Sequence, residues 1–385
     1  MNRSTDRFLT THTGSLPRPD DLIRAMFAKE EGVPVDPAAL AEQIARAVDG
    51  VVQKQAEAGV DIVDDGEMSK PSFVTYVQAR LAGFAPSHAP AGLPWAGSRE
   101  VLAFPAFYAS ASNTARIVSP LACTGPVRYV GHDAVRTDIA NLQTALSGVG
   151  GKEAFLPAVS PSNIEGRYTN KYYATEEEYL FAIADAMHEE YKAIVGAGLL
   201  VQIDDPRLVT YYIMQPQASI ADCRRWAEVR VAALNHALRD IPRDRVRFHT
   251  CYSINMGPRV HDMQLKDIVD VILKVRAGAY SFEAANPRHE HEWRVWEDVT
   301  LPDDALIIPG VITQSTVLVE HPELVAERIM KFASVVGRER IIAGADCGFA
   351  TFAGSTEIHP SIAWAKLSAL VDGARLASTR LWGRT

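Results

Sequence analysis

A repeated order of elements constrains the fold of this chain most. A helical stretch ends at a glycine, a short β-rich run follows, and the run leads into an acidic residue or a cysteine. In one example, Thr175 and Glu178 form a capping box, apolar residues then recur at helical spacing, and the run 199–203 leads into Asp204. The same order recurs around Gly59, Gly278 and Gly337. Parallel strands connected by crossover helices produce this order.

Nine runs predict strands: Phe8–Thr13, Val60–Val63, Arg116–Cys123, Phe155–Val159, Leu199–Ile203, Val246–Cys251, Ala279–Phe282, Leu306–Val311 and Ile341–Ile342. Eight parallel strands close a barrel, so we expect one run to be extra. The alternative is an open doubly wound sheet, which favours a glycine-rich phosphate turn, and neither GxGxxG nor GxxxxGK[ST] occurs. We therefore predict an α/β fold, a (β/α)8 TIM barrel in one domain over residues 1–385, with an excursion near 82–107 that forms a lid or a hairpin.

Composition excludes several classes of partner. The net charge is −8 and no cluster of basic residues occurs, which argues against nucleic-acid binding. No apolar run reaches about 18 residues, so we expect no membrane span. The N-terminus shows no secretory signal, and four scattered cysteines are too few for a disulfide framework. We expect a cytoplasmic protein that binds small molecules, and a homo-oligomer is compatible with the sequence.

Four residues at predicted strand ends suggest a metal site. His249 and Cys251 are two positions apart in one strand, so their side chains point the same way. Glu283 and Cys347 end two other strands, and the carboxyl ends of barrel strands meet at one mouth. One imidazole, two thiolates and a carboxylate form a tetrahedral shell that suits zinc. Taken singly, each cysteine is more typical of a small buried apolar residue than of a ligand, and only the four residues together favour a metal site.

The charge of this ligand set indicates its chemistry. Two thiolates and one carboxylate outnumber the charge of zinc, which makes the ion a poor Lewis acid for hydrolysis. Such an ion still binds an incoming thiol and holds it as a thiolate. This favours thiol alkylation, and no HExxH motif supports hydrolysis. Cys223 lies in a helical stretch, which indicates a packing residue. Cys123 also ends a predicted strand, so it is the residue most easily mistaken for a ligand.

Other charged residues at the mouth suggest substrate contacts. The acidic residues at strand ends suit a substrate with an ammonium group, or they cap the loops that follow. They are Asp64, Asp65, Glu67, Asp204, Asp205 and Asp346. The run 286–293 is dense in titratable groups, and either it holds an anionic substrate through Arg288 or it is a solvated loop.

At these residues the chain resembles the catalytic barrel of cobalamin-independent methionine synthase, over nearly its whole length. The matching segments are Thr10–Pro17, Asp65–Glu67, Gln202–Pro206, His249-x-Cys251, Glu283 and Asp346–Gly348. The resemblance implies a (β/α)8 barrel of the methionine synthase and uroporphyrinogen decarboxylase type. It implies that zinc binds His249, Cys251, Glu283 and Cys347. It further implies that Thr13 and Ser15 contact the carboxylate of an amino-acid thiol and that Glu67 and Asp204 hold its ammonium.

The chain departs from this family in three respects. The long methionine synthases carry a second, N-terminal barrel, for which 385 residues leave no room. Their proton-donor histidine, after a Pro-Gly-Val, is replaced by hydroxyl residues in Pro309–Thr316. Their folate-contacting glutamate falls near Thr210. Short relatives include single-barrel methionine synthases and epoxyalkane:coenzyme M transferases, and the stretch 283–293 looks closer to these short members.

Three functional hypotheses follow. The first is a zinc-dependent thiol alkyltransferase, with methyl transfer to a homocysteine-like thiol favoured over opening of an epoxide by coenzyme M. The second is a non-catalytic zinc-binding barrel, in which the metal gains no sulfur neighbour from an added thiol. The third is a metal-free barrel like the decarboxylases. The alkyl donor, the proton donor and the physiological thiol are not fixed by the sequence.

Overall fold

A parallel eight-stranded sheet forms the centre of the computed structural model, which describes residues 1–87, 95–110, 121–253, 256–355 and 357–383. The strand order is β1-β11-β10-β9-β8-β7-β5-β2. The strands are β1 (Leu9–Thr10), β2 (Ile62–Asp64), β5 (Glu153–Val159), β7 (Leu200–Asp204), β8 (Val246–Thr250), β9 (Ala279–Phe282), β10 (Leu306–Ile312) and β11 (Ile342–Ala345). At the two ends of this order, the Asp61 amide donates to the Thr10 carbonyl at 3.2 Å, so the sheet nearly closes. The predicted (β/α)8 barrel is confirmed.

The ninth predicted strand lies in a smaller sheet. Strand β4 (Leu121–Tyr129) pairs antiparallel with β3 (Leu81–Pro86) and parallel with β6 (Thr169–Asn170). Residues 116–120 of the predicted run lie outside the described residues. The excursion near 82–107 begins in β3 and continues in α3 (Arg99–Ala103) and α4 (Pro105–Ser110), and its part 88–94 is also outside the described residues.

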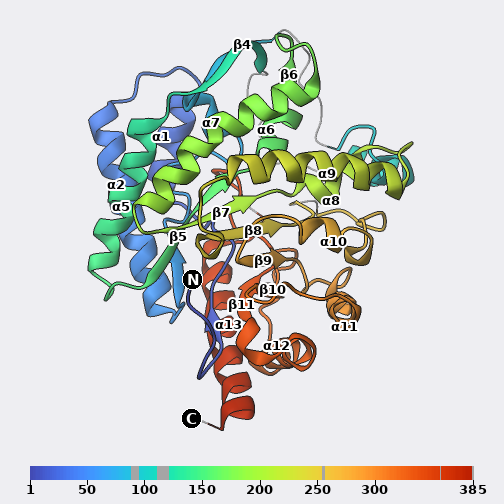
Figure 1. The fold of residues 1–385 in the computed structure, drawn as a ribbon. Helices are drawn as coiled ribbons and strands as arrows, with labels where there is room; N and C mark the ends of the chain where they lie inside the picture. The colour runs from blue at the N-terminus through green and yellow to red at the C-terminus, as the bar shows by residue number, and fades with distance from the viewer. Residues whose placement is uncertain (88–94, 111–120, 254–255, 356, 384–385) are drawn as a thin grey trace.

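Helices surround the barrel, with α2 and α5 at the left of Figure 1 and α12 and α13 at its lower end. The α-helices besides α3 and α4 are α1 (Asp20–Glu30), α2 (Pro37–Glu57), α5 (His132–Ser147), α6 (Pro161–Arg167), α7 (Glu176–Gly196), α8 (Arg207–Met214), α9 (Ile220–Ala237), α10 (Val269–Ile272), α11 (Val295–Asp298), α12 (Pro322–Val336) and α13 (Pro360–Trp382). The predicted capping box opens α7, where Thr175 Oγ accepts from the Glu178 amide at 3.1 Å. Among the described residues, no helix is long and apolar enough to cross a membrane.

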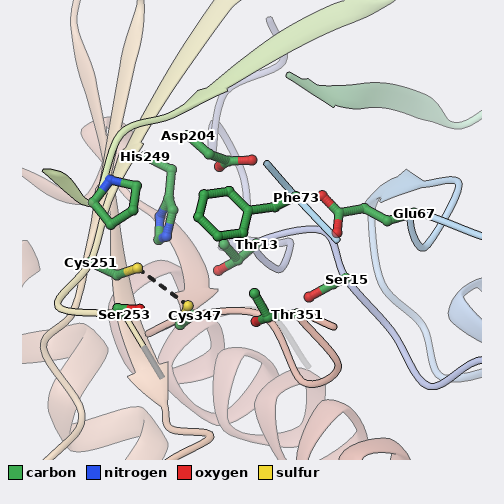
Figure 2. Close-up of a pocket in the computed structure, with 12 residues that line it drawn as sticks. Thr13, Ser15, Glu67, Phe73, Asp204, His249, Cys251, Ser253, Cys347 and Thr351 are labelled. Atoms are coloured by element: carbon green, nitrogen blue, oxygen red, sulfur yellow. Dashed lines mark hydrogen bonds between the residues drawn. The ribbon is translucent and has the colours of Figure 1, made fainter. Parts of the chain in front are cut away.

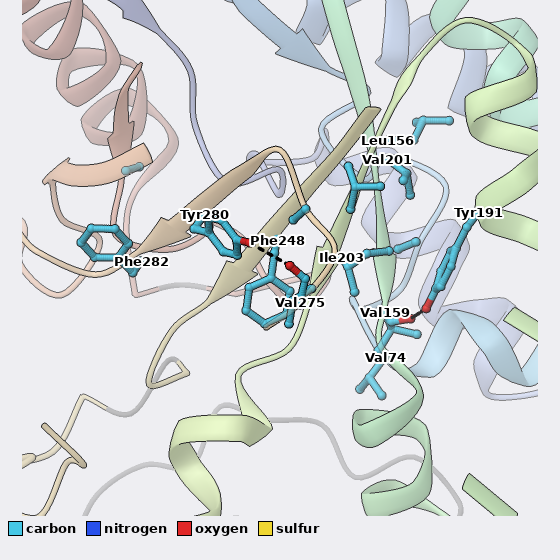
Figure 3. Packing of buried hydrophobic residues seen from close by; sticks show 14 of the residues in the cluster. Val74, Leu156, Val159, Tyr191, Val201, Ile203, Phe248, Val275, Tyr280 and Phe282 are labelled. Atoms are coloured by element: carbon cyan, nitrogen blue, oxygen red, sulfur yellow. Dashed lines mark hydrogen bonds between the residues drawn. The ribbon is translucent and has the colours of Figure 1, made fainter. Parts of the chain in front are cut away.

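Alternation along the strands separates two layers of core. Phe155 and Leu200 point into the barrel, whereas their neighbours Leu156 and Val201 pack outward against the helices. Figure 3 shows part of the outer layer, where Tyr191 of α7 donates to the Val159 carbonyl at 2.6 Å. Because both faces of the strands are buried, the strands are held rigidly and their carboxyl ends are fixed relative to one another.

A buried arginine lies inside the barrel, below the strand ends. Arg247 of β8 donates to Thr11 Oγ1 at 3.0 Å and to the His12 carbonyl at 2.9 Å, and its guanidinium lies 3.7 Å from the centre of the Phe155 ring. These contacts join β8 to the segment that follows β1. They therefore fix the two sides of the barrel mouth to each other.

Candidate active site

The carboxyl ends of the strands surround a cavity of about 400 Å³ that opens to solvent. Seven of the eight residues that the sequence indicated line it: Thr13, Ser15, Glu67, Asp204, His249, Cys251 and Cys347. Glu283 is not among the lining residues. Figure 2 shows the His249 ring and the two sulfur atoms at one side of the cavity, with Glu67 at the other side and Phe73 between them. The cavity therefore has a soft-donor end and a carboxylate end.

His249 presents a free nitrogen to the cavity. Its Nδ1 lies 3.1 Å from Ser281 Oγ, and its buried Nε2 has no hydrogen-bond partner among the described residues. Burial, together with the charge of Arg247, lowers the pKa of His249 to about 3. The ring is therefore neutral at physiological pH, and the Nε2 lone pair is available. In metal-binding histidines, a hydrogen bond at one ring nitrogen typically orients the other nitrogen toward the ion.

The two cysteines from β8 and β11 converge beside this ring. Cys251 Sγ and Cys347 Sγ are 3.3 Å apart, and both side chains are buried. The contact with Cys347 and the burial raise the pKa of the Cys251 thiol well above its usual value. Gly348 permits this arrangement, because a Cβ atom at that position would collide with Ser15 Oγ.

These three side chains fit a metal ion. His249, Cys251 and Cys347 each offer a donor atom, and the three atoms lie within 4.8 Å of one another. A buried imidazole nitrogen without a partner beside two adjacent thiols is costly unless an ion takes up these donors. One nitrogen and two sulfurs favour zinc over calcium or magnesium. Among the described residues, no carboxylate belongs to this three-donor group.

Glu283 follows β9 and is held by hydrogen bonds from the protein. Its Oε1 accepts from the Tyr252 amide at 2.8 Å. Its Oε2 accepts from Arg259 Nη2 and from Asn286 Nδ2, both at 2.7 Å. Burial raises the pKa of Glu283, which the charge of Arg259 opposes. Glu283 and Cys251 thus follow the neighbouring strands β9 and β8, but the Glu283 carboxylate binds Arg259.

Glu67 is held toward the cavity by a strained turn. Its φ is +59°, a left-handed conformation that is uncommon for a residue with a side chain. The Glu67 amide donates to Asp65 Oδ1 at 2.9 Å, and Arg18 donates to its carbonyl at 3.0 Å. The side chain is 3% exposed and its Oε2 has no hydrogen-bond partner among the described residues, although Arg18 lies 4.0 Å away. Burial raises the pKa of Glu67.

Asp204 supplies a second carboxylate at the end of β7. Its Oδ1 accepts from Gln202 Nε2 at 2.9 Å. Burial, together with the charge of Glu67, raises its pKa well above the usual value. A cation between the two carboxylates would stabilise the ionised form of both. Thr13 and Ser15 line the same cavity with hydroxyl groups, and Thr13 Oγ1 donates to the Ala345 carbonyl at 3.1 Å.

The remaining acidic residues cap loops and do not line the cavity. Asp64 Oδ1 accepts from the Gly66 amide and Asp65 Oδ1 from the Glu67 amide, both at 2.9 Å. Asp205 Oδ1 accepts from Ser162 Oγ at 2.6 Å, and Asp346 Oδ1 accepts from the Ala284 and Ala285 amides at 2.7 and 2.8 Å. For these four residues the structure matches the capping alternative.

Sequence reasoning missed five lining residues: Phe73, Pro206, Ser253, Gly348 and Thr351. The two-residue spacing that pairs His249 with Cys251 extends to Ser253 and could have found it. Phe73 and Thr351 lie in irregular segments, where no periodicity indicates which way a side chain points. The thiols of Cys123 and Cys223 are buried outside the three-donor group, so Cys123 is not brought to the site.

The run 286–293 is partly buried: His289 and Glu292 belong to a buried network, whereas Pro287, Arg288 and His291 are exposed. His289 stacks on Tyr252 with ring centres 4.1 Å apart, and its two ring nitrogens lie 3.1 Å from Asp262 Oδ2 and 2.8 Å from Glu292 Oε2. These carboxylates raise the pKa of His289 to about 9, against the opposing effect of burial. Arg288 is exposed, donates to the Val260 carbonyl at 3.2 Å and does not line the cavity, so the proposed anion contact is not formed there.

Comparison with known proteins identifies related sequences over the whole chain. Residues 169–374 match the family described as the cobalamin-independent synthase catalytic domain. A methionine synthase of Thermococcus kodakarensis is 26% identical over 381 residues, which cover 97% of this chain and 94% of that protein. A methionine synthase of Sulfurisphaera tokodaii is 24% identical, with 97% and 93% covered.

Solved structures share the fold. A B12-independent methionine synthase from Shewanella, in complex with selenomethionine, superposes with a TM-score of 0.74 at 19% identity, covering 98% of this chain and all of that one. A vitamin-B12 independent methionine synthase described for Listeria monocytogenes gives a TM-score of 0.67 at 19% identity, with 96% and 98% covered.

Proposed function

The chain belongs to the family of the cobalamin-independent synthase catalytic domain and is a methyl-transferring enzyme, and from this premise we propose that it methylates a homocysteine-like thiol on a zinc ion. One observation supports the proposal most directly. A cavity with an imidazole and two thiols at one side is also lined by two buried carboxylates, Glu67 and Asp204. An amino-acid thiol has the matching groups at its two ends.

The carboxylate end of the cavity selects an ammonium group. Glu67 and Asp204 both line it, and no lysine or arginine lies among the described lining residues. Glu67 Oε2 has no hydrogen-bond partner among the described residues, so a substrate ammonium would gain a charge-assisted hydrogen bond there. The hydroxyl groups of Thr13 and Ser15 are suited to receive the substrate carboxylate.

The soft-donor end would hold zinc through His249, Cys251 and Cys347, with Glu283 as the fourth residue of the proposed ligand set. When bound, zinc would lower the pKa of a thiol so that it is held as a thiolate at neutral pH. His249 contributes a neutral ring, oriented by Ser281, whose Nε2 carries a lone pair. The cavity, lined mostly by buried side chains, would hold the substrate in one orientation, which lowers the entropic barrier to attack.

The reaction itself is a displacement at carbon. The substrate sulfur forms a bond to the methyl carbon while the bond between that carbon and the donor breaks, and the donor group leaves with the electron pair. Phe73 lies between the sulfur atoms and Glu67 and adds an apolar surface to this region. Coenzyme M, with its sulfonate, is the less suitable thiol, because an anionic end group would meet Glu67 and Asp204 and no lysine or arginine is among the described residues that line the cavity.

X-ray absorption at the zinc edge tests this proposal without knowledge of the methyl donor. Addition of homocysteine to the zinc-loaded protein should raise the number of sulfur neighbours from two to three, because a catalytic zinc site keeps a position for its substrate. Coenzyme M at the same concentration is the control and should bind more weakly. An unchanged sulfur count with either thiol would contradict the proposal and would favour a non-catalytic zinc barrel. Absence of stoichiometric zinc would favour the metal-free barrel.

A further inference from the structure

A buried arginine contacts the proposed fourth zinc ligand. Arg259 lies in the loop that follows β8, and its side chain is 5% exposed. Its Nη2 donates to Glu283 Oε2 at 2.7 Å, and its Nε donates to Asp262 Oδ2 at 2.8 Å. The guanidinium therefore bridges two buried carboxylates. It provides Glu283 with a partner other than a metal ion.

The backbone around Arg259 is held in this position from outside the barrel. Its φ is +56°, a left-handed conformation that a side chain makes unfavourable. The Arg259 amide donates to Glu100 Oε2 at 3.1 Å, and the His261 amide donates to Glu100 Oε1 at 2.7 Å. Glu100 belongs to α3 and is fully buried. Two hydrogen bonds to a buried carboxylate offset the backbone strain and fix where the guanidinium lies.

Glu283 is oriented differently from the other three proposed ligands, and its hydrogen bond with Arg259 explains the difference. The donor atoms of His249, Cys251 and Cys347 lie within 4.8 Å of one another, and Glu283 is not part of that group among the described residues. Both of its oxygens instead accept hydrogen bonds, from Arg259, the Tyr252 amide and Asn286. A carboxylate with a strong charged partner binds a metal ion less tightly than a free one, because it must give up that partner.

We propose, on the basis of the proposed function, that Arg259 is a positioning residue that makes Glu283 an exchangeable zinc ligand. Arg259 competes with the ion for the Glu283 carboxylate. When the substrate thiol binds, the carboxylate has a paired and desolvated site to occupy, so the fourth position opens without leaving an unpaired buried charge. Three protein ligands with an open position are typical of catalytic zinc sites, whereas four are typical of structural ones.

The test replaces Arg259 and follows zinc release to a chelating dye. In Arg259→Gln, Glu283 loses its competing partner, so we expect zinc release to slow by about tenfold and the KM for homocysteine to rise with little change in kcat. A supporting residue that only orients a fixed ligand would act with the opposite sign, since loss of such residues weakens metal binding by about 10- to 100-fold. Faster zinc release from Arg259→Gln would therefore overturn the proposal.

A double-variant comparison connects the effect to Glu283. If Arg259 acts through this carboxylate, most of the gain in zinc retention should disappear when Arg259→Gln is made in a Glu283→Gln background. An equal gain in both backgrounds would contradict the proposal. The matched control is Arg288→Gln, because Arg288 is an exposed arginine nearby that contacts a carbonyl and not Glu283. It should leave zinc release unchanged.

Two further measurements test the role of Arg259 if the single variant does not fold, and separate that role from the proposed function. If Arg259→Gln does not fold, the variant Arg259→Gln with Asp262→Asn removes one cation and one anion together and should show the same slower release. X-ray absorption on the wild-type protein should show an oxygen neighbour lost as the thiol sulfur is gained. Retention of that oxygen would overturn the role of Arg259 while the third sulfur would still support the proposed function. Failure to gain sulfur would instead contradict the proposed function.

Discussion

Replacement of Glu67 by Gln tests how the cavity recognises its substrate. Gln keeps the shape of the side chain and can adopt the same backbone conformation, but it removes the negative charge. The Glu67 side chain is 3% exposed, and its Oε2 has no hydrogen-bond partner among the described residues. A hydrogen bond to a charged group contributes about 1.5–3 kcal/mol, so the KM for homocysteine should rise by about 10- to 150-fold.

The assay compares two thiols that differ only in the amino group. 4-Mercaptobutyrate has the chain and carboxylate of homocysteine but no ammonium. Glu67→Gln should weaken binding of homocysteine strongly and that of 4-mercaptobutyrate little, in titrations of the zinc-loaded protein. An equal loss for both thiols would refute the assignment, since it would show that Glu67 supports the cavity without contacting the ammonium. Glu297→Gln, at an exposed position of α11, serves as the control.

The pH dependence of binding gives an independent check on Glu67. Burial raises the pKa of this carboxyl in the free protein, and a bound ammonium favours its ionised form. Homocysteine should therefore bind more weakly as the pH falls toward the raised pKa of Glu67 and more tightly above it. The Gln variant should lack this part of the pH profile. A profile that is identical in the two proteins would mean that Glu67 does not titrate with substrate binding.

Further predictions concern the metal ligands and the His289 network. Cys347→Ser should lose zinc and activity while its circular dichroism stays that of the folded barrel, whereas Cys223→Ser, in the core at α9, should keep its zinc content; the reverse pattern would show that the ligand assignment is wrong. The pKa of His289 is raised from 6.5 to about 9, so its ion pairs stabilise the fold fully below about pH 6.5 and this contribution is lost as the pH rises through about 9. The full contribution is about 3 kcal/mol, and urea unfolding at about pH 6 and pH 10 should show this difference in the wild type but not in His289→Asn.

The positions of the site residues could be predicted because they are tied to regular structure. Parallel strands in a barrel end at one mouth, so a residue at a strand end has a known location once the strand is recognised. His249 lies near the end of β8 and Asp204 ends β7. Both residues line the cavity, as the strand pattern predicts. The ninth strand-like run also had a regular pattern, yet it became β4 of the small sheet. Periodicity alone does not distinguish a barrel strand from a strand in another sheet.

The direction of the Glu283 side chain could not be predicted in the same way. Its strand end fixes where the residue lies, but the carboxylate turns toward the strongest partner within reach. That partner is Arg259, whose position depends on a left-handed loop conformation. Glu100, 159 positions earlier in the chain, stabilises this conformation through a hydrogen bond. No local pattern in the sequence encodes a contact over that separation. The four proposed ligand residues are thus compatible with a closed structural site or an exchangeable catalytic one, and under the proposal made above a loop residue outside the ligand set, Arg259, decides between the two.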